Sequence, residues 1–193
     1  MPKVGMEPIR KRQIINATMA CIHEEGMGKT SLQRIARRAE ITSGLILHYF
    51  GDKAGLFEAV YRDLHRRLEE ETAVRLEQAT TPNDQLFALL EAQVCDEMVE
   101  PKTVATWLAL SAKASEMAII AKLEEQNAQK LASQTALLLQ QLGLGASEAT
   151  EVAEELMVLI YGVWLNLALH IISDPEQART ILFRFLKARI PQL

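Results

Sequence analysis

The sequence predicts an all-α protein of about nine helices. Apolar residues recur at three- and four-residue intervals through most of the 193 residues, and no stretch alternates apolar and polar residues as a half-buried strand would. Proline and glycine stand at the ends of these periodic stretches. The length and the 49% hydrophobic content suit one or two small domains with a sizeable core. The helices are expected at residues 8–25, 30–39, 42–50, 53–78, 82–98, 101–113, 115–142, 147–172 and 175–190.

Helix starts and stops follow from residues with known terminal preferences. Thr30 is expected to cap the second helix, with Gln33 completing a capping box, and Thr42 and Asp52 are expected to cap the third and fourth. Asp174-Pro-Glu-Gln177 predicts the start of the last helix, which should stop at Pro191. Glycines end the first and seventh helices in the same scheme.

Residues 31–50 have the pattern of two short helices joined by a tight turn. Ile35 and Ala39 share the apolar face of the first, and Ile46 and Phe50 of the second can pack back onto it. Two such helices, the second carrying exposed polar side chains, form the helix-turn-helix of DNA-binding proteins.

Charge is divided unevenly along the chain. Residues 1–67 hold 12 Lys/Arg against 7 Asp/Glu, a balance of +5, whereas residues 68–193 hold 9 against 18, a balance of −9. The total of −4 therefore hides a basic N-terminal part that can face DNA phosphates. A chance cluster of charge is the alternative explanation.

Several linked motifs within residues 35–56 carry a family resemblance. These are Ile35-Ala-Arg-Arg-Ala39, Ile41-Thr-Ser-Gly44, His48-Tyr-Phe50 and Asp52-Lys-Ala-Gly-Leu56. In order and spacing they resemble the N-terminal domain of TetR/AcrR-family repressors. Glu40 departs from the small residue usual in the turn, and Leu47 from a commonly polar or aromatic one.

Further segments are similar to one branch of that family, the choline-sensing repressors of glycine-betaine synthesis genes. They are Met1-Pro-Lys-Val-Gly-Met6, Ile9-Arg-Lys-Arg-Gln13, Trp107-Leu-Ala109 and Gly162-Val-Trp-Leu165. The resemblance implies a DNA-binding domain at 8–53 and a helical ligand-binding and dimerisation domain at 54–193.

The expected DNA contacts cluster at the helix-turn-helix. The N-terminal half of its second helix enters the major groove. The expected set is Thr30, Ser31, Arg34, Arg38, Thr42, Ser43, Gly44, Leu45, Leu47, His48, Tyr49 and Lys53. Tyr49 and Lys53 are included because they match backbone-contacting positions of the resembled family. Each has a simpler alternative: the threonines as helix caps, Leu47 packed inward, and His48 as an ordinary surface histidine.

A homodimer is expected because one helix-turn-helix makes too few contacts for tight specific binding to a palindromic double-stranded operator. Helices 147–172 and 175–190 carry more apolar surface than one chain can hide. The expected interface residues are Val152, Leu156, Leu159, Val163, Leu167, Ile171, Ile181, Leu182 and Phe185.

The inducer is expected to be a small molecule, with choline or a related quaternary amine implied by the resemblance. Aromatic rings attract such cations, and a carboxylate can supply counter-charge. The candidate residues are Phe87, Asp96, Trp107, Tyr161, Trp164 and Asn166. Ordinary core packing of these aromatic residues is the alternative.

Other classes of protein find little support. Four histidines without metal-ligand spacing and the absence of a nucleophile motif argue against an all-α enzyme, so we expect no catalytic, metal or cofactor site. Cys21 and Cys95 suit buried free thiols of a cytoplasmic protein. Leu156–Ile172 is at the short limit for a membrane span, and a buried interface helix explains it better. A regulator of efflux or lipid genes, or a DNA-binding protein without a ligand, stays open as an alternative.

Overall fold

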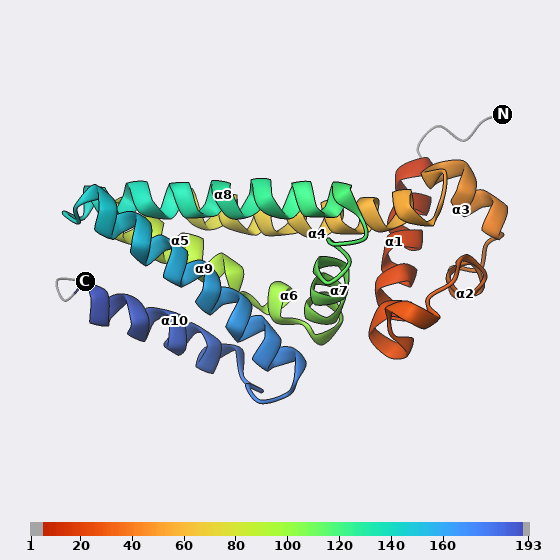
Figure 1. Cartoon of the computed structure of the whole chain (residues 1–193). Helices are drawn as coiled ribbons and strands as arrows, with labels where there is room; N and C mark the ends of the chain where they lie inside the picture. The colour runs from red at the N-terminus through yellow and green to blue at the C-terminus, as the bar shows by residue number, and fades with distance from the viewer. Residues whose placement is uncertain (1–5, 191–193) are drawn as a thin grey trace. The chain divides into compact units, whose positions relative to one another are not determined.

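The structure, a computed structural model, describes residues 6–190. Residues 1–5, which belong to a segment that carries the family resemblance, lie outside these residues. Pro191, the expected end of the last helix, also lies outside them. The only regular secondary structure in the described residues is helical, with ten α-helices and one 3₁₀ helix, most of them labelled in Figure 1. Nine of the α-helices have seven or more residues, which confirms the predicted class and number.

The described helices have the following bounds. They are α1 Met6–Glu25, η1 Met27–Lys29, α2 Leu32–Arg38, α3 Ser43–Phe50, α4 Lys53–Leu76, α5 Pro82–Gln93, α6 Asp96–Val99, α7 Pro101–Ser111, α8 Ala118–Gln141, α9 Ala146–Ala168 and α10 Pro175–Arg189. The single helix expected at 82–98 is in fact α5 and the four-residue α6, separated at Val94 and Cys95.

The chain divides into two compact units. The first unit holds the residues up to His65 together with Ala105–Ala121, and the second holds Arg66–Val104 and the chain from Lys122 onward. Helices α4, α7 and α8 each contribute residues to both. This division differs from the one expected at 53/54, which stays a prediction about function.

The first unit is built around fully buried aliphatic side chains from four helices. They are Ile14 and Met19 of α1, Ile35 of α2, Ile46 of α3, and Leu56 and Leu64 of α4. Burying each such side chain stabilises the fold by roughly 1.5–3 kcal/mol, an upper estimate. Helix α7 joins this core through Trp107, whose ring lies 4.5 Å from that of His65 and 5.9 Å from that of Tyr61.

The junction of α3 and α4 explains part of the family motif at residues 52–56. Asp52 accepts the Gly55 backbone N–H at 2.7 Å, which confirms its expected role as a cap. A Cβ on Gly55 would lie 2.2 Å from the backbone oxygen of Phe50, so only glycine fits there. The end of α3 is thereby held close to the first turn of α4.

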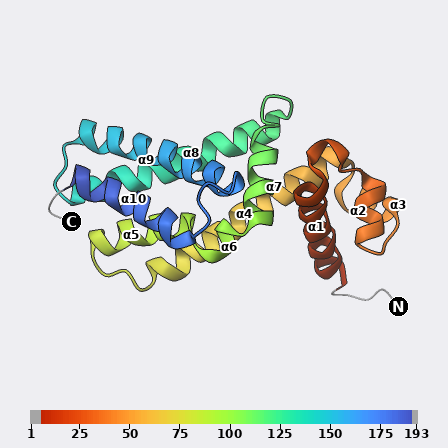
Figure 2. The same cartoon turned by 90° about the horizontal axis from the view of Figure 1, so that it is seen from below.

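The second unit is a bundle in which α9 and α10 run antiparallel as neighbours (Figures 1 and 2). Phe183 of α10 packs edge-on against Phe87 of α5 at 4.9 Å. Lys130 of α8 pairs with Glu69 of α4 at 2.7 Å. Asp174 caps α10 as expected, accepting the Glu176 backbone N–H at 2.9 Å.

The predictions about the two cysteines and about a membrane span can be compared with the structure. Cys21 and Cys95 are free and buried, as predicted, and burial raises the pKa of the Cys95 thiol. No helix within residues 6–190, α9 included, combines the length and the apolarity needed for a membrane span.

The turn of the helix-turn-helix contains a strained residue. Glu40 has a φ of 53°, a left-handed conformation that favours glycine and costs other residues about 1–2 kcal/mol. We expect Glu40→Gly to stabilise the first unit by up to about 1 kcal/mol, and so to raise the midpoint in scanning calorimetry by about 2–4 °C.

Glu40→Ala is the matched control, because it removes the same charge and keeps a Cβ at positive φ. An equal gain for both variants would show that charge, rather than backbone strain, sets the stability of this turn.

Candidate nucleic-acid interface

Helix α3 presents one buried face and one exposed face. Thr42 caps it by accepting the Leu45 backbone N–H at 3.3 Å, as predicted. Ile46 is fully buried, whereas Gly44, Leu47 and His48 are exposed. Leu47 is 43% exposed, so it does not pack inward. The exposed residues recur at helical spacing and form one surface, which together with the half-buried Ser43 we call the reading face.

Side chains beside this face come from three elements. Leu45 and Tyr49 are half-buried, and the Tyr49 and His48 rings lie 5.3 Å apart. The Lys11 Nζ lies 5.9 Å from the Tyr49 ring centroid and 2.8 Å from Glu7. Lys53, also half-buried, has its Nζ 5.2 Å from the centroid of Phe57. Lys11 therefore lies beside Tyr49 with its charge shared by Glu7, and a DNA phosphate can replace that exposed carboxylate as its partner.

Thr30 does not have the predicted role. It is only 1% exposed, and its hydroxyl donates to the Gly26 backbone oxygen at 2.9 Å. Ser31 caps α2 instead, accepting the Arg34 N–H at 3.3 Å. The predicted capping box with Gln33 is therefore wrong, because the η1 turn places Thr30 inside the unit.

The two predicted arginines of α2 are exposed and carry internal partners. Arg34 pairs with Glu25, and Arg38 donates to both carboxylate oxygens of Glu24, with Nη1 and Oε2 2.6 Å apart. This hydrogen bonding holds the pKa of the Glu24 carboxyl below its usual value. Exposed pairs of this kind contribute little to stability, so a phosphate can take over either guanidinium.

Arg37 is a surface cation that the predicted set omitted. It lies exposed on α2 between the two paired arginines, and within residues 6–190 it has no ion pair. The helical spacing of the apolar Ile35 and Ala39 leaves Arg37, like Arg34 and Arg38, outside the apolar face of α2. What the sequence could not show is that its neighbours are held by Glu24 and Glu25.

The residues predicted to bind a ligand are divided between the two units. Trp107 belongs to the first unit, whereas the other five belong to the second. Trp164 is buried, and its indole donates to the Gln93 backbone oxygen at 2.9 Å. Phe87 packs against Phe183. Asn166 donates to the Gly162 backbone oxygen of its own helix at 2.6 Å.

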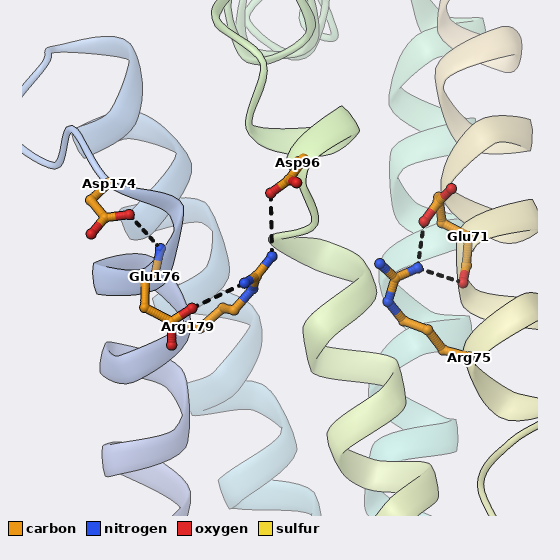
Figure 3. Close-up of polar contacts among 6 residues, drawn as sticks. All are labelled: Glu71, Arg75, Asp96, Asp174, Glu176 and Arg179. Carbon is orange, nitrogen blue, oxygen red and sulfur yellow. Dashed lines mark hydrogen bonds and ion pairs between the residues drawn. The ribbon is translucent and has the colours of Figure 1, made fainter.

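Two of the predicted ligand residues have charged partners that the sequence did not indicate. The Tyr161 hydroxyl donates to Glu124 of α8 at 2.6 Å, and its ring lies 5.7 Å from that of Trp164. Desolvation of the hydroxyl, followed by its bond to Glu124, raises the pKa of Tyr161, although the residue as a whole is 36% exposed. Asp96 lies exposed on α6 and pairs with Arg179 of α10 at 3.3 Å (Figure 3).

Four of the nine predicted dimer residues are buried in their own unit. Val152, Leu156, Val163 and Leu182 are buried within the chain, so they offer no surface to a partner. Leu159, Leu167, Ile181 and Phe185 are half-buried, and Ile171 is exposed. The large apolar side chains exposed on α9 are instead Val158, Tyr161 and Leu165, with Leu169 just beyond its end. We call these four residues the α9 stripe.

Sequence profiles of known families match both parts of the chain. Residues 14–60 match the profile described as bacterial regulatory proteins of the tetR family. Residues 82–191 match the profile described as the C-terminal part of BetI-type transcriptional repressors. Together these profiles cover the reading face and the second unit from residue 82 onward.

Curated relatives are similar over almost the whole chain. The HTH-type transcriptional regulator BetI of Cronobacter sakazakii is 37% identical over an alignment of 196 residues, covering 98% of this chain and 95% of that protein. BetI of Pectobacterium carotovorum is 36% identical, covering 98% of each chain. These relatives are named as transcriptional regulators rather than as enzymes.

Solved structures share the fold at lower identity. A transcriptional regulator from Pseudomonas aeruginosa superposes with a TM-score of 0.81 at 22% identity, covering 96% of this chain and 92% of that one. A regulator from Saccharomonospora viridis, solved in complex with choline, gives 0.77 at 19% identity, covering 93% and 96%. The helix-turn-helix, the two profiles and the full-length similarity agree: the chain belongs to the TetR family of bacterial transcriptional regulators and, within it, to the BetI-type repressors.

Proposed function

We propose that this BetI-type repressor binds a palindromic operator as a homodimer and leaves it when choline or a related quaternary amine binds. The observation that carries the proposal is the reading face of α3, which sits in a chain similar to BetI proteins over 98% of its length. A cytoplasmic location accompanies it, because the operator lies there.

The reading face supplies chemistry suited to the major groove. The Ser43 hydroxyl and the His48 ring can hydrogen-bond base edges or phosphates, and Gly44 allows close approach of the backbone. Leu47 offers an apolar contact for a thymine methyl group. The exposed Arg37, together with Arg34 and Arg38, supplies charge for the flanking phosphates.

The α9 stripe supports the homodimer. Val158, Leu165 and Leu169 are each at least half exposed, and they recur at three- to four-residue spacing with Tyr161. An exposed apolar row of this kind marks an interaction surface, and a two-fold axis would place it against its own copy. The interface proposed from the sequence is therefore moved to the outer side of α9.

The proposal of a choline-like inducer rests on similarity to other proteins. BetI relatives and a fold relative solved with choline support this class of ligand for the present chain. Release from DNA requires that the ligand bind the released form better than the operator-bound form. The expected link is α4, which begins directly after the reading helix and continues into the second unit.

We expect the protein to shift DNA from upstream of its own gene in a gel, and millimolar choline to reverse the shift. The carbon analogue of choline, in which a tert-butyl group replaces the trimethylammonium, is the matched uncharged control. Retained binding with choline present, combined with release by a hydrophobic efflux substrate or a fatty acid derivative, would replace the choline proposal with the alternative pathway.

Two kinds of substitution on the first unit should weaken operator binding differently. Leu47→Ala and His48→Ala should each cost about 1–3 kcal/mol on the operator and reduce discrimination between sequences. Arg37→Ala should weaken binding to all sequences, and it should reduce the slope of log affinity against log salt concentration by about one, the contribution of one phosphate contact. Fluorescence anisotropy with operator and scrambled duplexes at several salt concentrations measures both.

Val74→Ala is the control for these variants, because Val74 is an exposed apolar residue of the second unit. Unchanged operator affinity for both α3 variants would show that the reading face does not contact the operator.

Leu165→Glu should convert the dimer to a monomer, because it places one carboxylate of each chain within the α9 stripe, where the two chains would meet. Sedimentation velocity measures the change. Leu137→Glu is the matched control, because Leu137 of α8 is 59% exposed and Leu165 is 50% exposed. A dimer that survives Leu165→Glu and dissociates with Leu137→Glu would place the interface on α8.

A further inference from the structure

The second unit contains a cleft that includes Asp96 but none of the other predicted ligand residues. It has a volume of ≈ 330 Å³ and lies between α6, the start of α7, the end of α9 and the segment leading to α10. Val99, Val104, Leu167 and Ile172 supply apolar walls. Asp96 and Glu100 supply two carboxylates. All of these residues belong to the second unit.

The charge around the cleft favours a cation. Besides the two carboxylates, its lining includes His170 but no lysine or arginine. The Asp96 carboxylate pairs with Arg179 at 3.3 Å, and Arg179 also serves Glu176 at 3.0 Å (Figure 3). Glu100 pairs with Lys102 at 3.2 Å. Three carboxylates thus share two cations, and exposed pairs of this kind exchange partners at little cost.

The size of the cleft and the nature of its walls narrow the class of cation. Small-molecule sites begin at roughly 300 Å³ and combine apolar walls with a few polar groups. A compact organic ammonium ion fits this description, because its alkyl groups can contact the apolar walls while its charge faces the carboxylates. A metal ion would leave the apolar walls without a function, and an anion would meet the same charge as its own.

We propose that this cleft binds a small alkylammonium cation, held by Asp96 and Glu100 against the apolar walls of α7 and α9. The inference rests on the proposed function, because it names the site at which the inducer class acts. It assigns Asp96 to ligand binding and replaces the predicted aromatic cage with carboxylates and aliphatic walls.

The cleft and the α9 stripe can be occupied at the same time. At about 100° per residue, Leu167 points about 200° away from Leu165 around the helix axis. Leu167 accordingly lines the cleft and is half-buried, whereas Leu165 is exposed in the stripe. A dimer formed through the stripe leaves the cleft accessible from the other side of α9.

A bound cation competes with Arg179 for Asp96. The Arg179–Asp96 pair joins α10 to α6, so occupancy replaces a contact between these helices with a contact to the ligand. The competition predicts opposite effects of two substitutions on the affinity for the cation. Removal of the Asp96 carboxylate weakens binding, and removal of the Arg179 guanidinium strengthens it.

Calorimetric titration of the full chain with choline chloride and with tetramethylammonium chloride tests the site. Asp96→Asn and Glu100→Gln are each expected to raise the dissociation constant by about three- to tenfold, and Arg179→Gln to lower it by about threefold. Glu97→Gln should leave it unchanged. Glu97 is on the same helix as Asp96 but pairs with Arg67 at 3.5 Å and does not line the cleft.

Each outcome bears on a different statement. Release of the operator by choline, with wild-type affinity in both carboxylate variants, overturns this site and leaves the proposed function intact. Failure of the wild-type protein to bind either cation, with operator binding retained, overturns both the site and the choline class. Equal binding of the uncharged carbon analogue also overturns the site. Opposite shifts for Asp96→Asn and Arg179→Gln support it, and damage to the fold cannot produce them.

Discussion

The burial of Ile46 is the constraint on which the DNA-binding half of the molecule depends. Helix α3 has only eight residues, and isolated helices shorter than about 12–15 residues are marginal in water. Its position therefore comes from packing and from its ends. Ile46 is fully buried, Thr42 caps one end, and Gly55 lets α4 approach the other. With Ile46 inside, helical geometry turns His48 about 200° away from it, to the outer side of α3, where Leu47 is exposed beside it.

Features that depend on neighbours three or four residues away were predictable. Thr42, Asp52 and Asp174 cap their helices as the sequence indicated. Thr30 was not predictable in the same way, because Ser31 beside it is an equally good cap. Tertiary burial of Thr30 beneath the η1 turn decided between the two hydroxyls, and no local pattern records that burial. The break between α5 and α6 has no proline or glycine to mark it.

Helix α9 shows why the sequence does not reveal which apolar residues face outward. It is apolar on two sides, so a three-to-four spacing can be followed from either one. The sequence led to Val152, Leu156 and Val163, which face the interior, whereas the outer row contains Val158 and Leu165. The same ambiguity affected Trp164, whose indole hydrogen bond to the Gln93 backbone oxygen identifies it as part of the core.

The central claim is that the exposed side of α3 reads the major groove in two symmetric half-sites. Dimethyl sulfate methylates guanine N7 in that groove, so protection of the operator from methylation tests the claim directly. The account predicts two protected patches about one helical turn, 10–10.5 base pairs, apart, which choline abolishes. Protection only of adenine N3, which the same reagent methylates in the minor groove, would contradict it. A single protected patch would also contradict it.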